Sequence, residues 1–494
     1  MQLKTLLENI TLNNTKPIPD CEIYGIAYDS RQVQEGYLFI CIKGLNTDGH
    51  LYAQEAVQRG ARAVLGEEVL SLPPEIIMVQ TENTRAVLPV LASNYYGNPS
   101  RQLKLIGVTG TNGKTTVTHI IKAILEEAGY KVGIIGTLYA SVGLYLRDMG
   151  HTTPESIEIE QFLSECVKQN AHFVIMEVSS HALAMQRVEE LSFHSAVYTN
   201  LTQDHLDFHH DMTAYKEAKL SLFKKLAGQP NAYGIVNADD EYGGDFLKGS
   251  PVTAYTYGMT KKAAVKADKV QYSMRGTIFT VNLGQENITI EMKLIGRFNV
   301  YNALAAIAVA WQEGIDAHTI KKALGKMKGV AGRFEQVDCG QDYTVIVDYA
   351  HTPDGLENIL TAAREIAKNK IITVFGCGGG RDRGKRPLMG GIAAKHSDFT
   401  IITTDNPRHE EPESIIAEIM PGMGNIADSS FMVIIDRYEA IRQAVKLAEK
   451  NDMVIIAGKG HETYQLVKEQ VLDFDDRKVA AALIKERLVH EAHP

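Results

Sequence analysis

A glycine-rich loop between an apolar run and a helical run most constrains how this chain can fold. Residues 103–108 form the apolar run, residues 109–113 the loop, and residues 115–128 the helical run. Glycine lets backbone N–H groups approach an anion without a Cβ in the way, and the first turn of a helix adds free N–H groups and a positive dipole end. The order of strand, loop and helix predicts a phosphate-binding loop inside a parallel α/β domain.

The side chains of this loop fit the same interpretation. Lys114 is expected to neutralise β- and γ-phosphate charge, and Thr115 to offer its hydroxyl to Mg²⁺. The spacing departs from the standard phosphate loop, because Val108 stands where the first glycine is expected. A glycine turn with an incidental lysine is the alternative, and the strand–loop–helix context favours phosphate binding.

The length of the chain and its recurring apolar runs predict three domains. The chain has 494 residues, enough for about three domains of ~150 residues each. Turn and breaker residues at 97–100 suggest one boundary, and a second series of alternating apolar and helical runs begins near Gly332. We expect domains at 1–98, 99–332 and 333–494, of which the last two hold parallel sheets covered by helices on both faces.

Three shorter stretches lead to local expectations. The run 132–146 is interpreted as strand, turn and strand, because glycines and polar residues interrupt it. Residues 263–290 alternate polar and apolar side chains and are expected to be β-rich. The helix 300–312 is expected to follow an asparagine-containing turn.

Charge and cysteine usage argue against several classes of protein. The net charge of −9 disfavours a general nucleic-acid binder. The five cysteines are odd in number and form no C-x-x-C pair, which disfavours a disulfide framework or a zinc site and fits a reducing compartment. The start lacks the pattern of a secretory signal, and no run approaches the ~20 apolar residues that cross a bilayer. We expect a cytoplasmic monomer without nucleic-acid or membrane partners.

Candidate metal ligands follow two later apolar runs. Glu177 ends the run 173–176, and carboxylates at strand C-termini are well placed to hold Mg²⁺, which prefers oxygen ligands. In the segment 200–211, seven of twelve residues are His, Asp or Asn. A solvated polar loop and a zinc site are the alternatives for this segment, and no cysteine supports zinc.

Four ordered motifs resemble those of the Mur ligases. They are Gly110–Thr116, Glu177–Ser180, Asn200–Leu201 with Asp204–Asp207, and Asp348–Pro353. The resemblance spans the chain and implies a UDP-binding N-terminal domain, a central ATPase and a C-terminal Rossmann-like domain. Folylpolyglutamate synthases are similar in the last two domains only.

The resemblance implies a set of ATP and metal ligands. It places ATP against Gly110, Thr111, Asn112, Gly113, Lys114, Thr115, Thr116, Asn302, Arg333 and Asp348. It implies Mg²⁺ at Thr115, Glu177, His205 and Lys219, and catalytic roles for Lys114, Glu177, His205 and Lys219. Lys219 matches a lysine that the family carbamylates, whereas from the sequence alone it is an ordinary surface lysine of a helix.

The resemblance also implies contacts to a UDP-muramoyl dipeptide, UDP-N-acetylmuramoyl-L-alanyl-D-glutamate. These contacts are Ser30, Thr152, Thr153, Ser179 and Arg187. The family carries a glutamine two positions before this arginine. Here that position is Met185, and Gln186 lies one place along.

The segment Thr404–Arg408 indicates which amino acid is the second substrate. meso-Diaminopimelate differs from lysine by a second carboxylate. An arginine can bind such a carboxylate through two parallel hydrogen bonds. Asp405, Asn406, Pro407 and Arg408 resemble the signature of the diaminopimelate-adding members of the family, and lysine-adding members lack this arginine. Arg381 is expected to be a second cation for a substrate carboxylate, and Gly458 and Glu462 to accept the far ammonium.

The expected reaction is ATP-dependent formation of an amide bond through an acyl phosphate, with ATP and Mg²⁺ as cofactors. Three other functions remain open from the sequence. A phosphotransferase or GTPase without ligation is disfavoured by Val108 and by the absence of an Asn-Lys-x-Asp motif. A nucleotide-binding regulator without turnover is disfavoured by the set of metal candidates. A lysine-adding ligase is the nearest alternative.

Overall fold

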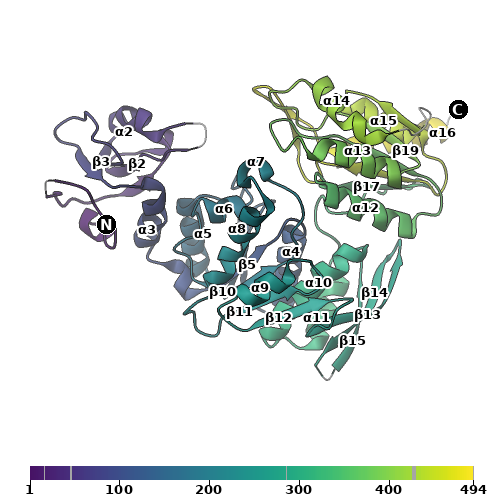
Figure 1. Ribbon diagram of the computed structural model, residues 1–494, viewed down its shortest axis with the longest axis horizontal. Helices are drawn as coiled ribbons and strands as arrows, with labels where there is room; N and C mark the ends of the chain where they lie inside the picture. The colour runs from purple at the N-terminus through teal and green to yellow at the C-terminus, as the bar shows by residue number, and fades with distance from the viewer. Residues whose placement is uncertain (16, 45–46, 285, 425–429, 493–494) are drawn as a thin grey trace.

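The computed structural model describes all residues except 16, 45–46, 285, 425–429 and 493–494. Its chain forms three sheet-containing domains, in agreement with the predicted α/β architecture. Figure 1 shows the N-terminal domain at one end, the central domain in the middle and the C-terminal domain at the other end, so that the two termini lie far apart.

The N-terminal domain is a four-stranded parallel sheet in the order β1-β2-β3-β4. Two clusters of buried apolar side chains cover its two faces, one including Leu88 and Leu91 of α3 and the other Ala53 and Ala56 of α2. Its elements are α1 (Leu3–Leu6), β1 (Gly25–Ala27), η1 (Ser30–Gln32), β2 (Tyr37–Ile40), η2 (Gly49–Tyr52), α2 (Ala53–Gln58), β3 (Ala61–Gly66), β4 (Ile77–Gln80) and α3 (Thr84–Tyr96).

The central domain is built on an eleven-stranded sheet, ordered β15-β14-β13-β12-β11-β10-β5-β9-β6-β7-β8. Strands β13, β12, β11, β10, β5, β9 and β6 run parallel, and antiparallel strands extend the sheet at both ends. Its strands are β5 (Lys104–Thr109), β6 (Val132–Ile135), β7 (Ala140–Val142), β8 (Tyr145–Arg147), β9 (Phe173–Glu177), β10 (Phe193–Tyr198), β11 (Tyr233–Asn237), β12 (Ala254–Gly258), β13 (Val265–Ser273), β14 (Gly276–Leu283) and β15 (Glu286–Met292).

Helices cover both faces of the central sheet. Apolar side chains of α4, α10 and α11 form a core on one face, and those of α5, α6, α8 and α9 form a core on the other. The helical elements are η3 (Pro99–Gln102), α4 (Lys114–Glu127), α5 (Ser156–Lys168), α6 (Ser180–Ala184), α7 (Leu206–His209), α8 (Met212–Lys224), α9 (Gly243–Gly249), α10 (Arg297–Gln312) and α11 (Ala317–Lys326).

Two local expectations need correction. The run 132–146 holds three short strands rather than two, because β7 and β8 form a hairpin that extends the sheet beyond β6. The expected turn before residue 300 belongs to helix α10, which begins at Arg297. Asn299 donates its side-chain amide to the carbonyl of Ile295 at 2.8 Å, so this asparagine stabilises the first turn instead of preceding it.

The C-terminal domain holds a six-stranded sheet, ordered β16-β17-β21-β18-β19-β20, in which only β16 is antiparallel to its neighbour. Helices α12, α13 and α14 pack on one face, and α15 and α16 on the other. Its elements are β16 (Glu335–Gln336), β17 (Thr344–Asp348), α12 (Pro353–Ile366), β18 (Ile371–Phe375), α13 (Lys385–His396), β19 (Phe399–Ile402), α14 (Pro412–Met423), β20 (Phe431–Val433), α15 (Arg437–Leu447), β21 (Met453–Ala457), β22 (Tyr464–Val467), β23 (Gln470–Asp473) and α16 (Asp476–Ala492).

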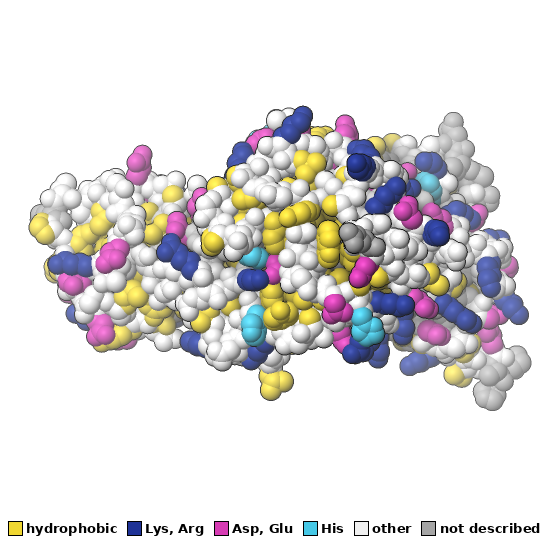
Figure 2. Space-filling model, turned by 90° about the horizontal axis from the view of Figure 1, so that it is seen from below, with side chains coloured by type: hydrophobic (Ala, Val, Ile, Leu, Met, Phe, Trp, Pro, Cys, Tyr) yellow, Lys and Arg dark blue, Asp and Glu magenta, His cyan; other side chains and the backbone are white. Residues whose placement is uncertain are grey.

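The surface and the cysteines add little constraint on function. Figure 2 shows cationic and acidic side chains interspersed over one face of the molecule. Among the described residues, no helix is both long and apolar enough to cross a membrane. All five cysteines are free, and four of them are buried.

Candidate active site

A cavity of about 540 Å³ lies between the central and C-terminal domains. The carboxyl ends of parallel strands from both domains line it, which is where ligands bind in open α/β sheets. The predicted residues on its wall are Thr111, Asn112, Gly113, Lys114, Thr115, Thr116, Thr152, Glu177, Ser179, His205, Asn302, Arg333, Asp348, Arg381, Asp405, Asn406, Arg408, Gly458 and Glu462. Residues more than 300 positions apart in sequence therefore share one cavity.

The phosphate loop is shaped by its two glycines. Gly110 and Gly113 have positive φ, and a Cβ would collide with Thr199 at the first and with Asn302 at the second. Lys114 folds back over the loop and donates to the carbonyls of Gly110 and Thr111 at 2.9 and 2.8 Å. Desolvation lowers the pKa of Lys114. An arriving phosphate would offer this ammonium a full negative charge in place of two neutral carbonyls.

Glu177 is the centre of a buried cluster of oxygen atoms at the end of β9. Its carboxylate accepts hydrogen bonds from the Thr115 hydroxyl at 2.9 Å, the Thr137 hydroxyl at 3.0 Å and the Thr137 backbone N–H at 2.8 Å. One carboxylate and two hydroxyls suit Mg²⁺, which prefers oxygen ligands and retains several waters. Among the described residues, no three His, Cys, Asp or Glu side chains are grouped as a metal site.

His205 and Lys219 lie next to the phosphate loop. The ring of His205 lies 3.2 Å from the Asp204 carboxylate, and desolvation lowers the pKa of His205 to about 3, so the imidazole is neutral at physiological pH. Lys219 is only 1% exposed and donates to the carbonyl of Gly110 at 2.8 Å. The interpretation of Lys219 as a surface lysine is therefore wrong. Burial, and then the charge of Lys114, hold the pKa of Lys219 well below its usual value.

The residues expected to meet the nucleotide come from both domains. Asn302 donates to Asn299 at 3.1 Å beneath the phosphate loop. Arg333 donates to the Thr115 hydroxyl at 3.0 Å and lies 4.4 Å from the centre of the Tyr349 ring. Asp348 accepts the N–H groups of Phe334 and Ala350, and burial raises its pKa to about 6.

The residues expected to hold the muramoyl peptide are only partly brought together. Thr153 donates its hydroxyl to the Glu177 carbonyl at 2.8 Å and accepts the Ser179 N–H at 3.0 Å. Arg187 donates to the Thr153 carbonyl at 3.0 Å, and the Met185 sulfur lies 3.5 Å from its guanidinium. Ser30 lies in the N-terminal domain, away from the cavity wall, and donates to Glu55 at 3.0 Å.

The residues expected to hold the second substrate follow strands β18, β19 and β21. Arg408 has a positive φ of 52° and donates to the Gly379 carbonyl at 2.7 Å. Arg381 is exposed at the same rim of the cavity. Asn406 donates to Glu462 at 2.8 Å. The carbonyl of Pro407 lies under Gly379, where any Cβ would collide with it.

Several residues on the cavity wall were not anticipated. Thr137 follows the buried strand β6, so the rule that ligands gather at strand ends could have found it. Asp354, at the start of α12, accepts the Asn112 side chain at 2.6 Å and joins the phosphate loop to the C-terminal domain. No local pattern marks Asp354, because the contact exists only after the two domains meet.

The chain matches known proteins over nearly its whole length. Three family models match in order: the Mur ligase family catalytic domain at residues 22–96, the Mur ligase middle domain at 108–310, and the Mur ligase glutamate ligase domain at 332–460. A curated UDP-N-acetylmuramoyl-L-alanyl-D-glutamate–2,6-diaminopimelate ligase of Syntrophomonas wolfei is 54% identical, covering 99% of this chain and 100% of that protein.

Two further comparisons agree. The protein of the same name from Clostridium botulinum is 45% identical, covering 98% of this chain and 99% of its own. A solved structure of a ligase with this name is 32% identical, with a TM-score of 0.66, covering 94% of this chain and 95% of its own. With its three domains, its interdomain cavity and these relatives, the chain belongs to the Mur ligase family.

Proposed function

We propose that this chain uses ATP to join 2,6-diaminopimelate to the D-glutamate of UDP-N-acetylmuramoyl-L-alanyl-D-glutamate, a step of peptidoglycan precursor synthesis. The observation that carries the choice of amino acid is the pair Arg408 and Arg381, which line the same cavity as the phosphate loop. The relatives with full-length similarity bear the name of this ligase. All substrates of the reaction are water-soluble, which fits an enzyme of the cytoplasm, and we expect the chain to act as a monomer.

In the first half-reaction, a carboxylate of the dipeptide attacks the γ-phosphorus of ATP, and ADP leaves. Charge spreads over the transferred phosphoryl group in the transition state, so fixed cations accelerate the step. Lys114 supplies such a cation once it leaves the carbonyls of Gly110 and Thr111 for the phosphates. Backbone N–H groups at the start of α4 add further donors.

Mg²⁺ fits the oxygen cluster at the end of β9. Glu177, Thr115, His205 and a carbamylated Lys219 would hold it, and it would neutralise phosphate charge there. Thr137 keeps the Glu177 carboxylate in place through its hydroxyl and its backbone N–H.

In the second half-reaction, the amine of the acceptor attacks the acyl carbon, and inorganic phosphate leaves through a tetrahedral intermediate. The residues of this chain act here by positioning the amine. Arg408 and Arg381 fit the far carboxylate of diaminopimelate, and Asp405 and Glu462 line the same end of the cavity to meet ammonium groups. L-Lysine lacks the far carboxylate and would leave both arginines without that partner.

The test is phosphate release with ATP, Mg²⁺ and the UDP-linked dipeptide, adding meso-diaminopimelate or L-lysine in parallel. We expect turnover with diaminopimelate, and a loss of about 2–3 kcal/mol in kcat/KM for this amino acid in Arg408→Ala, the range of a charge-assisted pair. Arg364→Ala is the matched control, since Arg364 pairs with Asp398 at 2.8 Å on the surface of the same domain.

The outcomes separate the alternatives. If the natural chain prefers lysine, it is still a ligase, but the proposed role of Arg408 in selecting diaminopimelate is rejected. Turnover that ignores the added amine would indicate a phosphotransferase, and absence of turnover a regulator.

A further inference from the structure

The acceptor end of the cavity is the end expected to bind the second amino acid. Two of its segments, those that carry Asp405 and Glu462, each follow a strand of the C-terminal sheet. Thr404 precedes the segment Asp405–Arg408 after β19, and Ala457 precedes the segment Gly458–Glu462 after β21. In the sheet these strands are separated by β18. Because β18 lies between them, no direct strand pairing fixes the distance between the two segments. This distance limits which amino acids can reach both segments at once.

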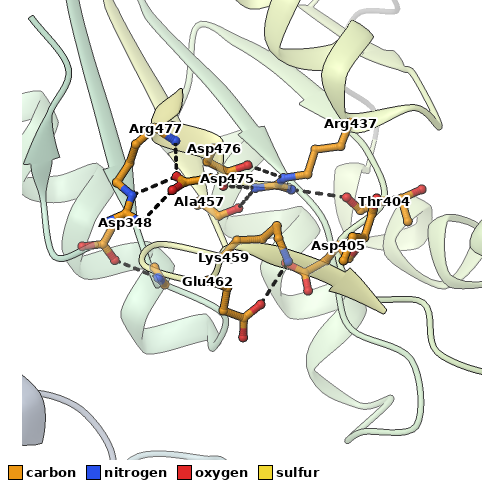
Figure 3. A network of polar contacts seen from close by, with 12 residues as sticks. Asp348, Thr404, Asp405, Arg437, Ala457, Lys459, Glu462, Asp475, Asp476 and Arg477 are labelled. Atoms are coloured by element: carbon orange, nitrogen blue, oxygen red, sulfur yellow. Dashed lines mark hydrogen bonds and ion pairs between the residues drawn. The ribbon is translucent and has the colours of Figure 1, made fainter. Parts of the chain in front are cut away.

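A single buried guanidinium joins the two segments. Arg437, the first residue of α15, is 1% exposed and donates to the Thr404 carbonyl at 3.3 Å and to the Ala457 carbonyl at 3.0 Å. Figure 3 shows this side chain reaching across between the two segments. Both carbonyls belong to the residue that directly precedes an acceptor segment.

Asp476 holds this guanidinium from the side of α16. Its two oxygens accept Nε and one Nη of Arg437 at 2.8 and 2.7 Å, and both side chains are fully buried. Burial alone would lower the pKa of Arg437, and the charges of Asp476, Asp405 and Glu462 raise it. The cation thus lies within electrostatic reach of the two carboxylates on the cavity wall.

A second buried cation ties the side chains of the same segments. Lys459 is fully buried and donates to Asn406 at 3.1 Å and to Glu462 at 3.0 Å. One oxygen of Asp405 is buried and has no hydrogen-bond partner among the described residues. The two segments lie close together here, because a Cβ on Gly458 would collide with this oxygen of Asp405.

Acidic and basic side chains are matched in this region. The buried part holds three carboxylates, on Asp405, Glu462 and Asp476, and two cations, on Arg437 and Lys459, and Arg408 adds a third cation at the cavity wall. A substrate carboxylate bound to Arg408 would leave the unpaired oxygen of Asp405 to accept an ammonium group. Without Asp476, the Arg437 charge would instead oppose an ammonium at this place.

We propose that Arg437 and Asp476 are positioning residues of the acceptor site, which set the spacing of its two segments and keep the region electronegative enough to take an amino acid's ammonium. The inference rests on the proposed function only in taking the second substrate to be a diamino acid. Neither residue lies on the cavity wall, so neither touches the substrate.

The test is steady-state kinetics of the full chain with Arg437→Lys and Asp476→Asn, varying each of the three substrates in turn. We expect the KM for meso-diaminopimelate to rise about tenfold, while the KM values for ATP and the dipeptide change less than about twofold. In Asp476→Asn the KM for diaminopimelate should rise further than in Arg437→Lys, because the buried charge of Arg437 is then left without its carboxylate and opposes the ammonium group.

Arg487→Lys is the matched control. Arg487 joins the same two helices at the other end of α15, where it donates to the carbonyls of Val445 and Ala448 and pairs with Glu491. A general loss of packing between α15 and α16 would affect this variant too, whereas the positioning role predicts an unchanged KM for diaminopimelate.

A double variant covers the case in which Asp476→Asn does not fold. Arg437→Gln with Asp476→Asn leaves no unpaired charge in the interior but loses the two carbonyl contacts, so its KM for diaminopimelate should still rise while the KM values for ATP and the dipeptide stay within about twofold. Equal changes in all three KM values, or none in any variant, would overturn the inference. Lack of any amine-dependent turnover in the natural chain would reject the proposed function instead.

Discussion

At the scale of single residues, Lys219 is the side chain whose environment matters most. A carbamate forms when a neutral amine attacks CO₂, and Lys219 is buried with a pKa well below its usual value. We expect Lys219→Arg, which cannot form a carbamate, to lower kcat by about a hundredfold or more. Carbon-13 NMR with labelled bicarbonate should show a carbamate signal in the natural chain and none in this variant.

Lys216 offers the control for this experiment. It lies in the same helix, pairs with Asp245 at 2.6 Å, and this hydrogen bond raises its pKa, so its amine stays protonated. Lys216→Arg should keep both the activity and the carbamate signal. A carbamate signal that survives Lys219→Arg would assign the modification to another amine.

The contrast between these two lysines also shows where sequence reasoning stops. Both stand in one helical run, and only the packed structure shows that Lys219 is buried and Lys216 is partly exposed. The phosphate loop could be predicted, because its strand, glycines and helix are contiguous. Thr137 could have been found from its place after β6, whereas Asp354 could not, since it meets Asn112 only once the two domains pack.

At the scale of elements, Glu313 ties the end of α10 to three strands of the central sheet. It accepts hydrogen bonds from Lys104 of β5 at 2.6 Å and Tyr233 of β11 at 2.8 Å, and it pairs with His194 of β10 at 2.7 Å. Burial alone would raise the pKa of Glu313, and these partners lower it to about 2. A lowered folded pKa stabilises the fold above the unfolded value of about 4.3.

We therefore expect Glu313→Gln to lose about 3 kcal/mol of stability at pH 7. The deficit should shrink as the pH falls from about 4.3 toward 2, because the natural chain then loses the same charge. Denaturant unfolding of both chains at pH 7 and pH 3 measures this difference in the free energy of unfolding. Glu127→Gln is the control, since Glu127 pairs with Lys322 and Lys326 at the surface. A pH-independent deficit would contradict the electrostatic account.

Element type was more predictable than element edges. The buried strands β5, β9, β18 and β21 coincide with continuous apolar runs of the sequence. The helices between them and the parallel sheets were also predicted. The start of α10 was missed, because asparagine usually marks turns, and only the contact of Asn299 with Ile295 shows it inside the helix. The extra strand β8 packs on an edge, where the sequence pattern is weak.

At the scale of the whole molecule, a chain of contacts runs from the N-terminal domain to the end of β9. Glu155 accepts Arg85 of α3 at 2.9 Å and pairs with Arg187 at 2.7 Å. Arg187 in turn donates to the carbonyl of Thr153, and the Thr153 hydroxyl donates to the carbonyl of Glu177. A UDP-linked peptide that extends from Ser30 to Thr153 would need the two domains held in this arrangement.

We expect Glu155→Gln to raise the KM for the UDP-linked dipeptide by about tenfold with little change in the KM for ATP, because it leaves Arg85 and Arg187 without their shared carboxylate. Tyr28→Phe is the comparison. It removes the hydrogen bond of Tyr28 to Glu158 at 2.9 Å, which also crosses the domain boundary but does not involve Arg187 or Thr153. If both variants raised the KM equally, loose attachment of the N-terminal domain would explain the effect. A defect confined to Glu155→Gln would trace it to the contacts of Arg187 and Thr153, and hence to alignment of the peptide with the carboxylate cluster at Glu177.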